Sequence, residues 1–136
     1  MANPLVFHGA VILFIGLLCG APLGSAVVQG KSEEKVRAWR VAHSSLTMGG
    51  ILLLAIAGIL AQLRLGAFAS SVLVWALVGS SYGFALVLPL AAHYGHRGLS
   101  FAPPLLNRAI YCGNMAGAGG LLIGTGVLLW GAYGSL

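Results

Sequence analysis

The sequence predicts an all-α membrane protein, a bundle of four transmembrane helices that forms a single domain over residues 1–136. Two observations predict this fold class. Hydrophobic residues make up 59% of the chain and charged residues 7%, which is more apolar surface than a soluble domain of this size can bury. The apolar residues also fall into four blocks, each long enough to cross a hydrocarbon core of about 30 Å. The expected spans are roughly residues 5–28, 38–63, 67–92 and 106–134.

The first two spans carry signals for their own bends and ends. Pro22 lies inside the first span, where we expect it to kink the helix. The polar segment 29–37 follows. Ser32, with Glu33 and Glu34 directly after it, suits the start of the second helix, because its hydroxyl can cap the free N–H groups and acids favour a helix N-terminus.

Basic residues predict how the bundle lies in the membrane. The polar loops at residues 29–37 and 93–104 share one side, and a short turn at residues 64–66 lies on the other. Six basic residues accompany the two loops: Lys31, Lys35, Arg37, Arg40, Arg97 and Arg108. Arg64 alone accompanies the turn. Because Lys and Arg gather in cytoplasmic loops, we expect a multi-pass protein of a bacterial inner membrane with both termini periplasmic.

Composition also bears on partners. The net charge of +5 sits in loops and forms no dense basic run with interleaved aromatic residues, so we expect membrane lipids and no nucleic acid as partners. Cys19 and Cys112 lie inside apolar blocks at no metal-ligand spacing, and we expect packing thiols. Several glycines are four residues apart, namely Gly16 and Gly20, Gly20 and Gly24, Gly79 and Gly83, Gly113 and Gly117, and Gly120 and Gly124. Such pairs predict close helix contacts and an oligomer.

Polar groups inside the spans are the candidates for function, because such groups are costly at membrane depth. His43 lies about one turn into the second span, and Trp39 and Thr47 lie one turn to either side on the same face. The third span brings Ser80, Ser81 and Tyr82 to mid-depth, and the fourth brings Asn107, Tyr111 and Asn114 to its cytoplasmic half. We expect these groups to meet in the cytoplasmic half of the bundle.

The acids limit the chemistry of such a site. Glu33 and Glu34 are the two acidic residues of the chain, and both lie in the first polar loop. A proton-coupled carrier would normally need an acid within the membrane, which disfavours that class. A hydrolase that uses two carboxylates is excluded.

His43 suits a haem better than a zinc ion. Zinc needs three or four protein ligands, whereas a porphyrin supplies four nitrogens and needs one axial histidine. Gly49 and Gly50 would leave room for a flat macrocycle, and Arg40, Arg97 or Arg108 would meet its propionates. A backbone carbonyl or water would hold the other ring nitrogen of the ligand. The alternative is that His43 hydrogen-bonds a neighbouring helix for packing, as we expect for His8.

Several segments resemble bacterial styrene oxide isomerases. Trp39-Arg40-Val41-Ala42-His43-Ser44 is similar to the family segment that holds the haem-ligating histidine. Phe7-His8-Gly9 resembles the opening helix of the family, and Gly83-Phe84 matches a pair in its third helix. His96-Arg97-Gly98-Leu99-Ser100-Phe101-Ala102-Pro103 is similar to the family loop Asn-Arg-Gly-Leu-Thr-Phe-Gly-Pro. The matches keep their order and spacing over about 100 residues.

The resemblance implies a trimer of four-helix subunits with haem b between subunits. The ferric iron would act as a Lewis acid that opens an apolar epoxide drawn from the lipid, and a hydride shift would give an aldehyde. His43 would be the iron ligand, and Trp39, Arg40, Thr47, Gly49 and Arg97 would contact the cofactor.

The substrate-handling residues depart from the family pattern. The active-site asparagine and tyrosine of the family fall at Gly49 and Ala85, and its aspartate falls near Leu77. Tyr82, Tyr111 and Asn114 are the residues that would replace them. Two other functions stay open: a non-catalytic haem-binding membrane protein, and a cofactor-free accessory subunit of a membrane complex.

Overall fold

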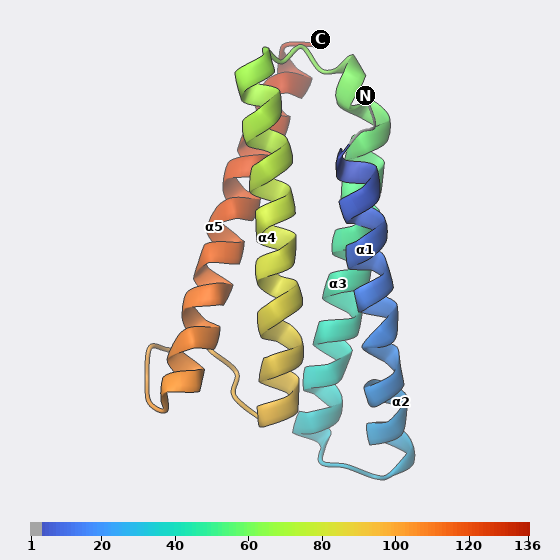
Figure 1. Cartoon of the computed structure of the whole chain (residues 1–136), viewed down its shortest axis with the longest axis vertical. Coiled ribbons are helices and arrows are strands. Elements are labelled where there is room, and N and C mark those ends of the chain that lie inside the picture. The colour runs from blue at the N-terminus through green and yellow to red at the C-terminus, as the bar shows by residue number, and fades with distance from the viewer. Residues whose placement is uncertain (1–3) are drawn as a thin grey trace.

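The computed structural model describes residues 4–136, and this part of the chain folds as helices joined by short connections, with no strand (Figure 1). The elements are α1 (Pro4–Leu18), α2 (Gly20–Val28), α3 (Glu33–Ile59), the 3₁₀ turn η1 (Leu60–Gln62), α4 (Ala67–Tyr94) and α5 (Leu105–Tyr133). Four stretches are long and apolar enough to cross a membrane: Pro4–Val28, Glu33–Gln62, Ala67–Tyr94 and Leu105–Tyr133. The predicted four-helix membrane fold is therefore confirmed.

Local chemistry explains where these helices begin and end. The first span is divided at Cys19, three residues before Pro22, whose missing N–H leaves the Leu18 carbonyl without its usual donor. Ser32 caps α3, its hydroxyl accepting a hydrogen bond from the Lys35 backbone N–H at 3.4 Å. The second span therefore begins at Glu33 rather than near residue 38, as the capping signal indicated. Gly95 ends α4 with a φ of +76°, a left-handed conformation that glycine adopts without strain.

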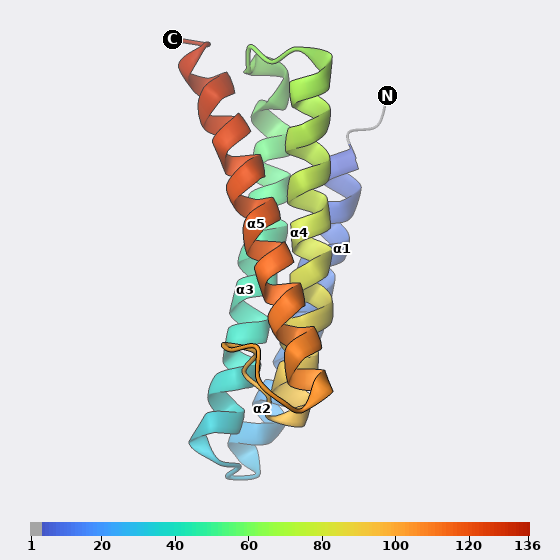
Figure 2. The same ribbon diagram turned by 90° about the vertical axis from the view of Figure 1, so that its left-hand side faces the viewer.

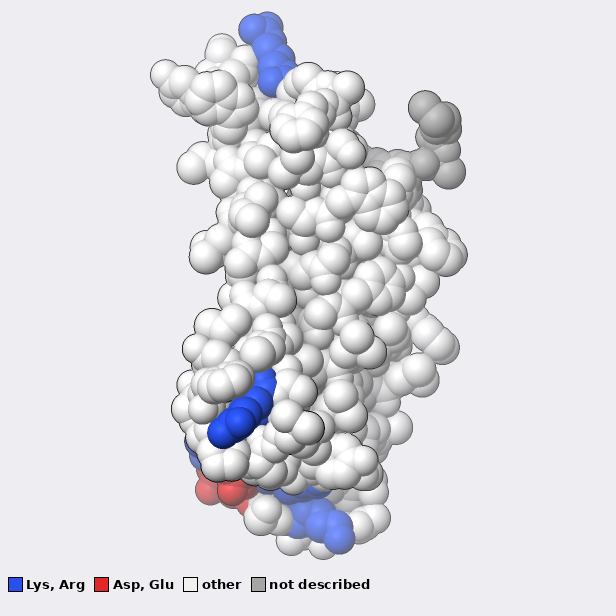
Figure 3. All heavy atoms as spheres, turned by 60° about the vertical axis from the view of Figure 1, so that its left-hand side comes forward, with Lys and Arg blue, Asp and Glu red and all other residues white. Residues whose placement is uncertain are grey.

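The helices form two antiparallel pairs that join along α3 and α4. The first pair is α1 and α2 against α3, and the second is α4 against α5 (Figures 1 and 2). Both chain ends lie at one end of the bundle, which we call the terminal end. Residues 29–32 and 95–104 lie at the opposite end, which we call the loop end. Figure 3 shows most of the visible Lys and Arg atoms toward the loop end, with one group at the terminal end. Which end faces the cytoplasm stays a prediction.

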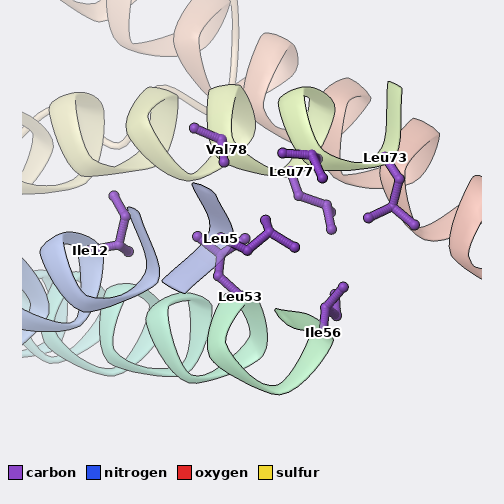
Figure 4. Close-up of a cluster of buried hydrophobic side chains, with 8 residues drawn as sticks. Leu5, Ile12, Leu53, Ile56, Leu73, Leu77 and Val78 are labelled. Carbon is purple, nitrogen blue, oxygen red and sulfur yellow. The ribbon is translucent and has the colours of Figure 1, made fainter. Parts of the chain in front are cut away.

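A buried apolar cluster holds three of the helices together in the half toward the terminal end (Figure 4). Its members come from α1, α3 and α4: Leu5, Ile12, Leu53, Ile56, Leu73, Val74, Leu77 and Val78. In lipid such a cluster stabilises the bundle through close packing rather than by removing surface from water. Helix α5 packs along α4 and contributes no buried member, but its partly buried Val127 and Leu128 pack against the cluster.

Glycines set the distance between the helices of each pair. A Cβ added to Gly16 would lie 2.5 Å from the Thr47 backbone nitrogen, and one added to Gly50 would lie 2.5 Å from that of Leu13, so α1 and α3 cross almost backbone to backbone. Gly124 does the same for α5, where a Cβ would lie 2.5 Å from a Leu77 methyl group. Close contact is thus confirmed for Gly16 and Gly124 among the predicted glycines, whereas the predicted Gly79 has nothing within 4 Å. Gly24 likewise faces open space.

Candidate functional site

His43 on α3 is held in one defined state by the first helix. Its Nδ1 lies 2.8 Å from the carbonyl oxygen of Gly16. A carbonyl oxygen only accepts hydrogen bonds, so Nδ1 carries the proton and donates it, and Nε2 keeps its lone pair. The ring is half-buried, and within residues 4–136 Nε2 has no hydrogen-bond partner and is open to its surroundings. This is the tautomer in which a histidine binds a metal ion through Nε2.

The glycines of the first span create this arrangement. The close approach of Gly16 to the backbone of Leu46 and Thr47 brings its carbonyl within reach of the imidazole one turn away. Gly20 lies beside the ring, where a Cβ would sit 3.4 Å from Cε1 and Nδ1 of His43. The prediction that a backbone carbonyl holds the second ring nitrogen is confirmed. The sequence could not identify Gly16 as the source of this carbonyl, because that depends on how α1 packs against α3.

Three predicted cofactor contacts lie on or beside the His43 face of α3. Trp39 is partly buried against the cluster of Cys19, Ala42 and Leu46, close to where the first span is divided. Thr47 donates its hydroxyl hydrogen to the His43 carbonyl at 2.7 Å. Arg40 is exposed one turn toward the loop end and is a suitable cation for an anionic substituent on a ligand of His43.

Gly49 and Arg97 lie elsewhere. Gly49 lines a cavity of about 450 Å³ formed by α3, α4 and Leu121 of α5, and Arg97 lines a second cavity of about 330 Å³ at the loop end. Val41 lines that second cavity too, and His43 follows it by two residues, which is about 200° around a helix. The predicted cofactor residues therefore do not share one face: Gly49 lies about 120° around α3 from His43, and Arg97 belongs to the loop after α4. Gly50 leaves no room for a macrocycle, since it packs against the Leu13 backbone, and that prediction was wrong.

Tyr82 forms a hydrogen bond with His8, the histidine of the first span. Its hydroxyl lies 3.0 Å from Nδ1 of His8, and the His8 ring also packs edge-on against Phe7 and Trp75. His8 precedes Gly16 by eight residues of α1, which corresponds to about 12 Å along the helix. Tyr82 therefore does not join His43 within the chain.

Asn107, Tyr111 and Asn114 hold the loop that precedes α5. The Asn107 side chain accepts a hydrogen bond from the Gly98 N–H at 3.1 Å and donates to the carbonyls of Ser100 and Ala102. Asn114 donates to the Gly98 carbonyl at 3.2 Å, and the Tyr111 ring lies 6.0 Å from that of Phe101. The expected meeting of these groups with His43 does not form within one chain. A role of Tyr82, Tyr111 or Asn114 in catalysis stays a prediction.

The two serine hydroxyls at the middle of α4 also form hydrogen bonds within the bundle. Ser80 is buried and donates to the Gly117 carbonyl of α5 at 2.5 Å, and Ser81 donates to the Leu77 carbonyl at 2.8 Å. Across residues 4–136, no three His, Cys, Asp or Glu side chains gather closely enough to hold a metal ion. His43 thus fits a group that brings its own further ligands, as a porphyrin does.

Fold and site together define a class: a small four-helix membrane protein that presents one histidine nitrogen in the loop-end half of the bundle. The family model of styrene oxide isomerase matches residues 1–133. The chain therefore belongs to the styrene oxide isomerase family, as the resemblance indicated. No curated protein and no solved structure matches it.

Proposed function

We propose that this protein is a haem-dependent membrane isomerase that converts an apolar epoxide into an aldehyde. Membership of the styrene oxide isomerase family supports the reaction class. The observation that carries the cofactor is the hydrogen bond from His43 Nδ1 to the Gly16 carbonyl, which leaves Nε2 free to bind iron. A ferric haem would supply a Lewis acid for the epoxide oxygen. The reaction rearranges one molecule, so the protein needs to supply neither a reductant nor an acid.

The residues on and beside the His43 face would set the orientation of the cofactor. The Gly16 carbonyl fixes the imidazole ring, and Gly20, which has no side chain, leaves space beside it. Arg40 would pair with a propionate at the membrane surface, where an exposed guanidinium can make two parallel hydrogen bonds to a carboxylate. The apolar surface of the spans would let a lipid-dissolved substrate reach the site laterally.

The division of the predicted contacts supports assembly of the chain as a homotrimer with haem between subunits. Gly49 lies about 9 Å along α3 from His43 and about 120° around it, which disfavours contact of one macrocycle with both residues of the same chain. Gly49 would therefore contact the cofactor only from a neighbouring copy. Such contact between two different faces closes into a ring when the rotation is a third of a turn.

Two measurements on the detergent-purified protein test the proposal. An absorption spectrum before and after dithionite should show a Soret band that shifts on reduction. The ferric protein should then convert an aryl epoxide such as styrene oxide into the aldehyde. The variant His43→Ala should lose both. A colourless wild type, produced with adequate haem, would remove the cofactor, and a coloured protein inactive on aryl and alkyl epoxides would instead be a non-catalytic haem protein.

A further inference from the structure

A cavity at the loop end does not include His43, although Arg97, which the family resemblance assigns to the cofactor, lines it. It measures about 330 Å³ and lies between the first turns of α3, the last turns of α4 and residues 95–99. Its walls are mainly apolar, with Val41, Leu88 and Leu99 among them, and charged side chains line the rest. This size and mixture of surfaces are typical of sites for small amphiphilic molecules.

Positive charge exceeds negative charge around the cavity. Lys35, Arg37 and Arg97 line it, together with Glu34. Arg37 is neutralised by an ion pair of 2.8 Å with Glu33. Lys35 donates its ammonium hydrogen to the His93 carbonyl, which holds it beside the end of α4. Within residues 4–136, the Arg97 guanidinium has no hydrogen-bond or ion-pair partner. A cation is therefore available here for an external anion.

The loop that carries Arg97 is held firmly. The next residue, Gly98, is buried, and its N–H and carbonyl bind the side chains of Asn107 and Asn114. Its φ of +56° favours glycine, and an added Cβ would lie 3.0 Å from Asn114 Nδ2. Both asparagines belong to α5, so the second helix pair positions Arg97 against the first. These bonds fix the backbone from which the Arg97 side chain extends at the mouth of the cavity.

An apolar groove continues from this cavity into the depth of the bundle. Leu88 lines both the loop-end cavity and the 450 Å³ cavity between α3 and α4. On α3, Ala38 and Val41 line the first cavity and Ser45 and Leu52 line the second, a spacing that places all four on one face. The loop-end cavity and the apolar cavity thus adjoin each other at Leu88 and lie along one face of α3.

We propose that this cavity binds an anionic phospholipid. Its phosphate would pair with Arg97 and Lys35, and an acyl chain would run past Leu88 along the groove between α3 and α4. The position at the end of the four spans matches the depth of a lipid headgroup. His43 of the same chain lines neither cavity, so a haem bound by that residue would leave this site open within the chain.

Native mass spectrometry of the full-length protein in detergent provides the test. Phosphatidylglycerol and phosphatidylcholine with identical acyl chains are the probes, and glycerol phosphate is the headgroup without a chain. We expect phosphatidylglycerol to be retained more strongly than either. Arg97→Gln should lower its affinity about fivefold, since one cation near the membrane surface contributes about a factor of five. Lys35→Gln should have a similar effect, and the matched control Arg64→Gln, at the terminal end, should have none.

Three results would overturn the proposal. Equal retention of the two phospholipids would show that charge plays no part. Equal affinity for glycerol phosphate would make this a site for free anions. If Arg97→Gln lowers haem content and leaves lipid retention unchanged, the cation serves a propionate from a neighbouring copy instead. The haem-free variant His43→Ala should retain phosphatidylglycerol as the wild type does, which separates this proposal from the proposed function.

Discussion

His43 and His8, the two histidines that lie well inside the spans, differ in what their rings contact. Each has its Nδ1 in a hydrogen bond to another helix, His43 at 2.8 Å and His8 at 3.0 Å. The partner of His43 is the Gly16 carbonyl, which accepts only and so determines the tautomer. The partner of His8 is the Tyr82 hydroxyl, which both donates and accepts and so leaves the tautomer open.

The space around the two imidazole rings differs as well. His43 has a glycine, Gly20, beside its ring, whereas His8 is packed edge-on by the rings of Phe7, Trp75 and Tyr82. Space and a defined tautomer suit a ligand, and aromatic contacts suit a packing residue. A histidine in an apolar span is thus not by itself a site. The partner of its second nitrogen and the space around the ring decide its role.

The largest expected difference is in haem content, between the variant that lacks His43 and the variant that lacks His8. His43→Ala should abolish the Soret band, because the axial ligand is lost. His8→Ala should keep it, since His8 makes only packing contacts and the Tyr82 bond. The measurement is the ratio of haem absorbance to protein absorbance for both purified variants. If His8→Ala loses the Soret band while its fold stays intact, the proposal that His43 binds the iron is wrong.

The two histidines should also lie in opposite halves of the membrane, His43 in the cytoplasmic half and His8 in the periplasmic half. Single cysteines at Gln29 and Leu136, in a background with Cys19→Ala and Cys112→Ala, report on the loop end and the terminal end. We expect an impermeant thiol reagent added from the periplasm to label position 136 and spare position 29, because basic residues gather at the loop end. The reverse pattern would place His43 in the periplasmic half.

The next largest effect on haem retention should come from disturbing the Gly16 carbonyl, which accepts the hydrogen bond from His43. Gly16→Ala would bring a Cβ to 2.5 Å from the Thr47 backbone, which forces α1 away from α3 and lengthens the hydrogen bond to His43. Losing such a partner typically lowers metal affinity 10- to 100-fold. The measurement is haem dissociation into an excess of apomyoglobin. Gly24→Ala is the matched control, because Gly24 lies in the same span and faces open space. Equal haem retention in the two variants would contradict this role of Gly16.

Local patterns explain why much of the fold could be predicted. Hydropathy is a local property, so the four spans followed from composition along the chain. The start of α3 followed from Ser32 and the two acids after it, since a cap needs only neighbouring residues. The bend near Pro22 was expected because the lost N–H belongs to proline itself.

The arrangement of polar groups could not be predicted from the same patterns. Helix periodicity places Tyr82 and Asn114 on a face of their own helix, but it does not say which neighbour that face meets. Close glycine contacts set the rotation of each helix, as Gly50 does against Leu13. These contacts turn Tyr82 toward His8 and Asn114 toward Gly98. His43 could be singled out as a candidate because cost at membrane depth is a property of one residue.

The smallest effect should come from removal of the Tyr82 hydroxyl. Tyr82→Phe loses one hydrogen bond to His8, and such bonds between membrane helices contribute about 0.6 kcal/mol on average. We therefore expect a slight loss of stability in a detergent unfolding titration, unchanged haem content and unchanged turnover of the epoxide. Tyr111→Phe is the matched control, because its ring stacks near Phe101 and should lose little without the hydroxyl. A drop in turnover of 10²-fold or more with haem intact, the size expected for a donor to developing charge, would show that Tyr82 acts on the substrate. Because His8 lies far along α1 from Gly16, that result would mean that the substrate meets Tyr82 of a neighbouring copy, and it would place the reaction at a subunit interface.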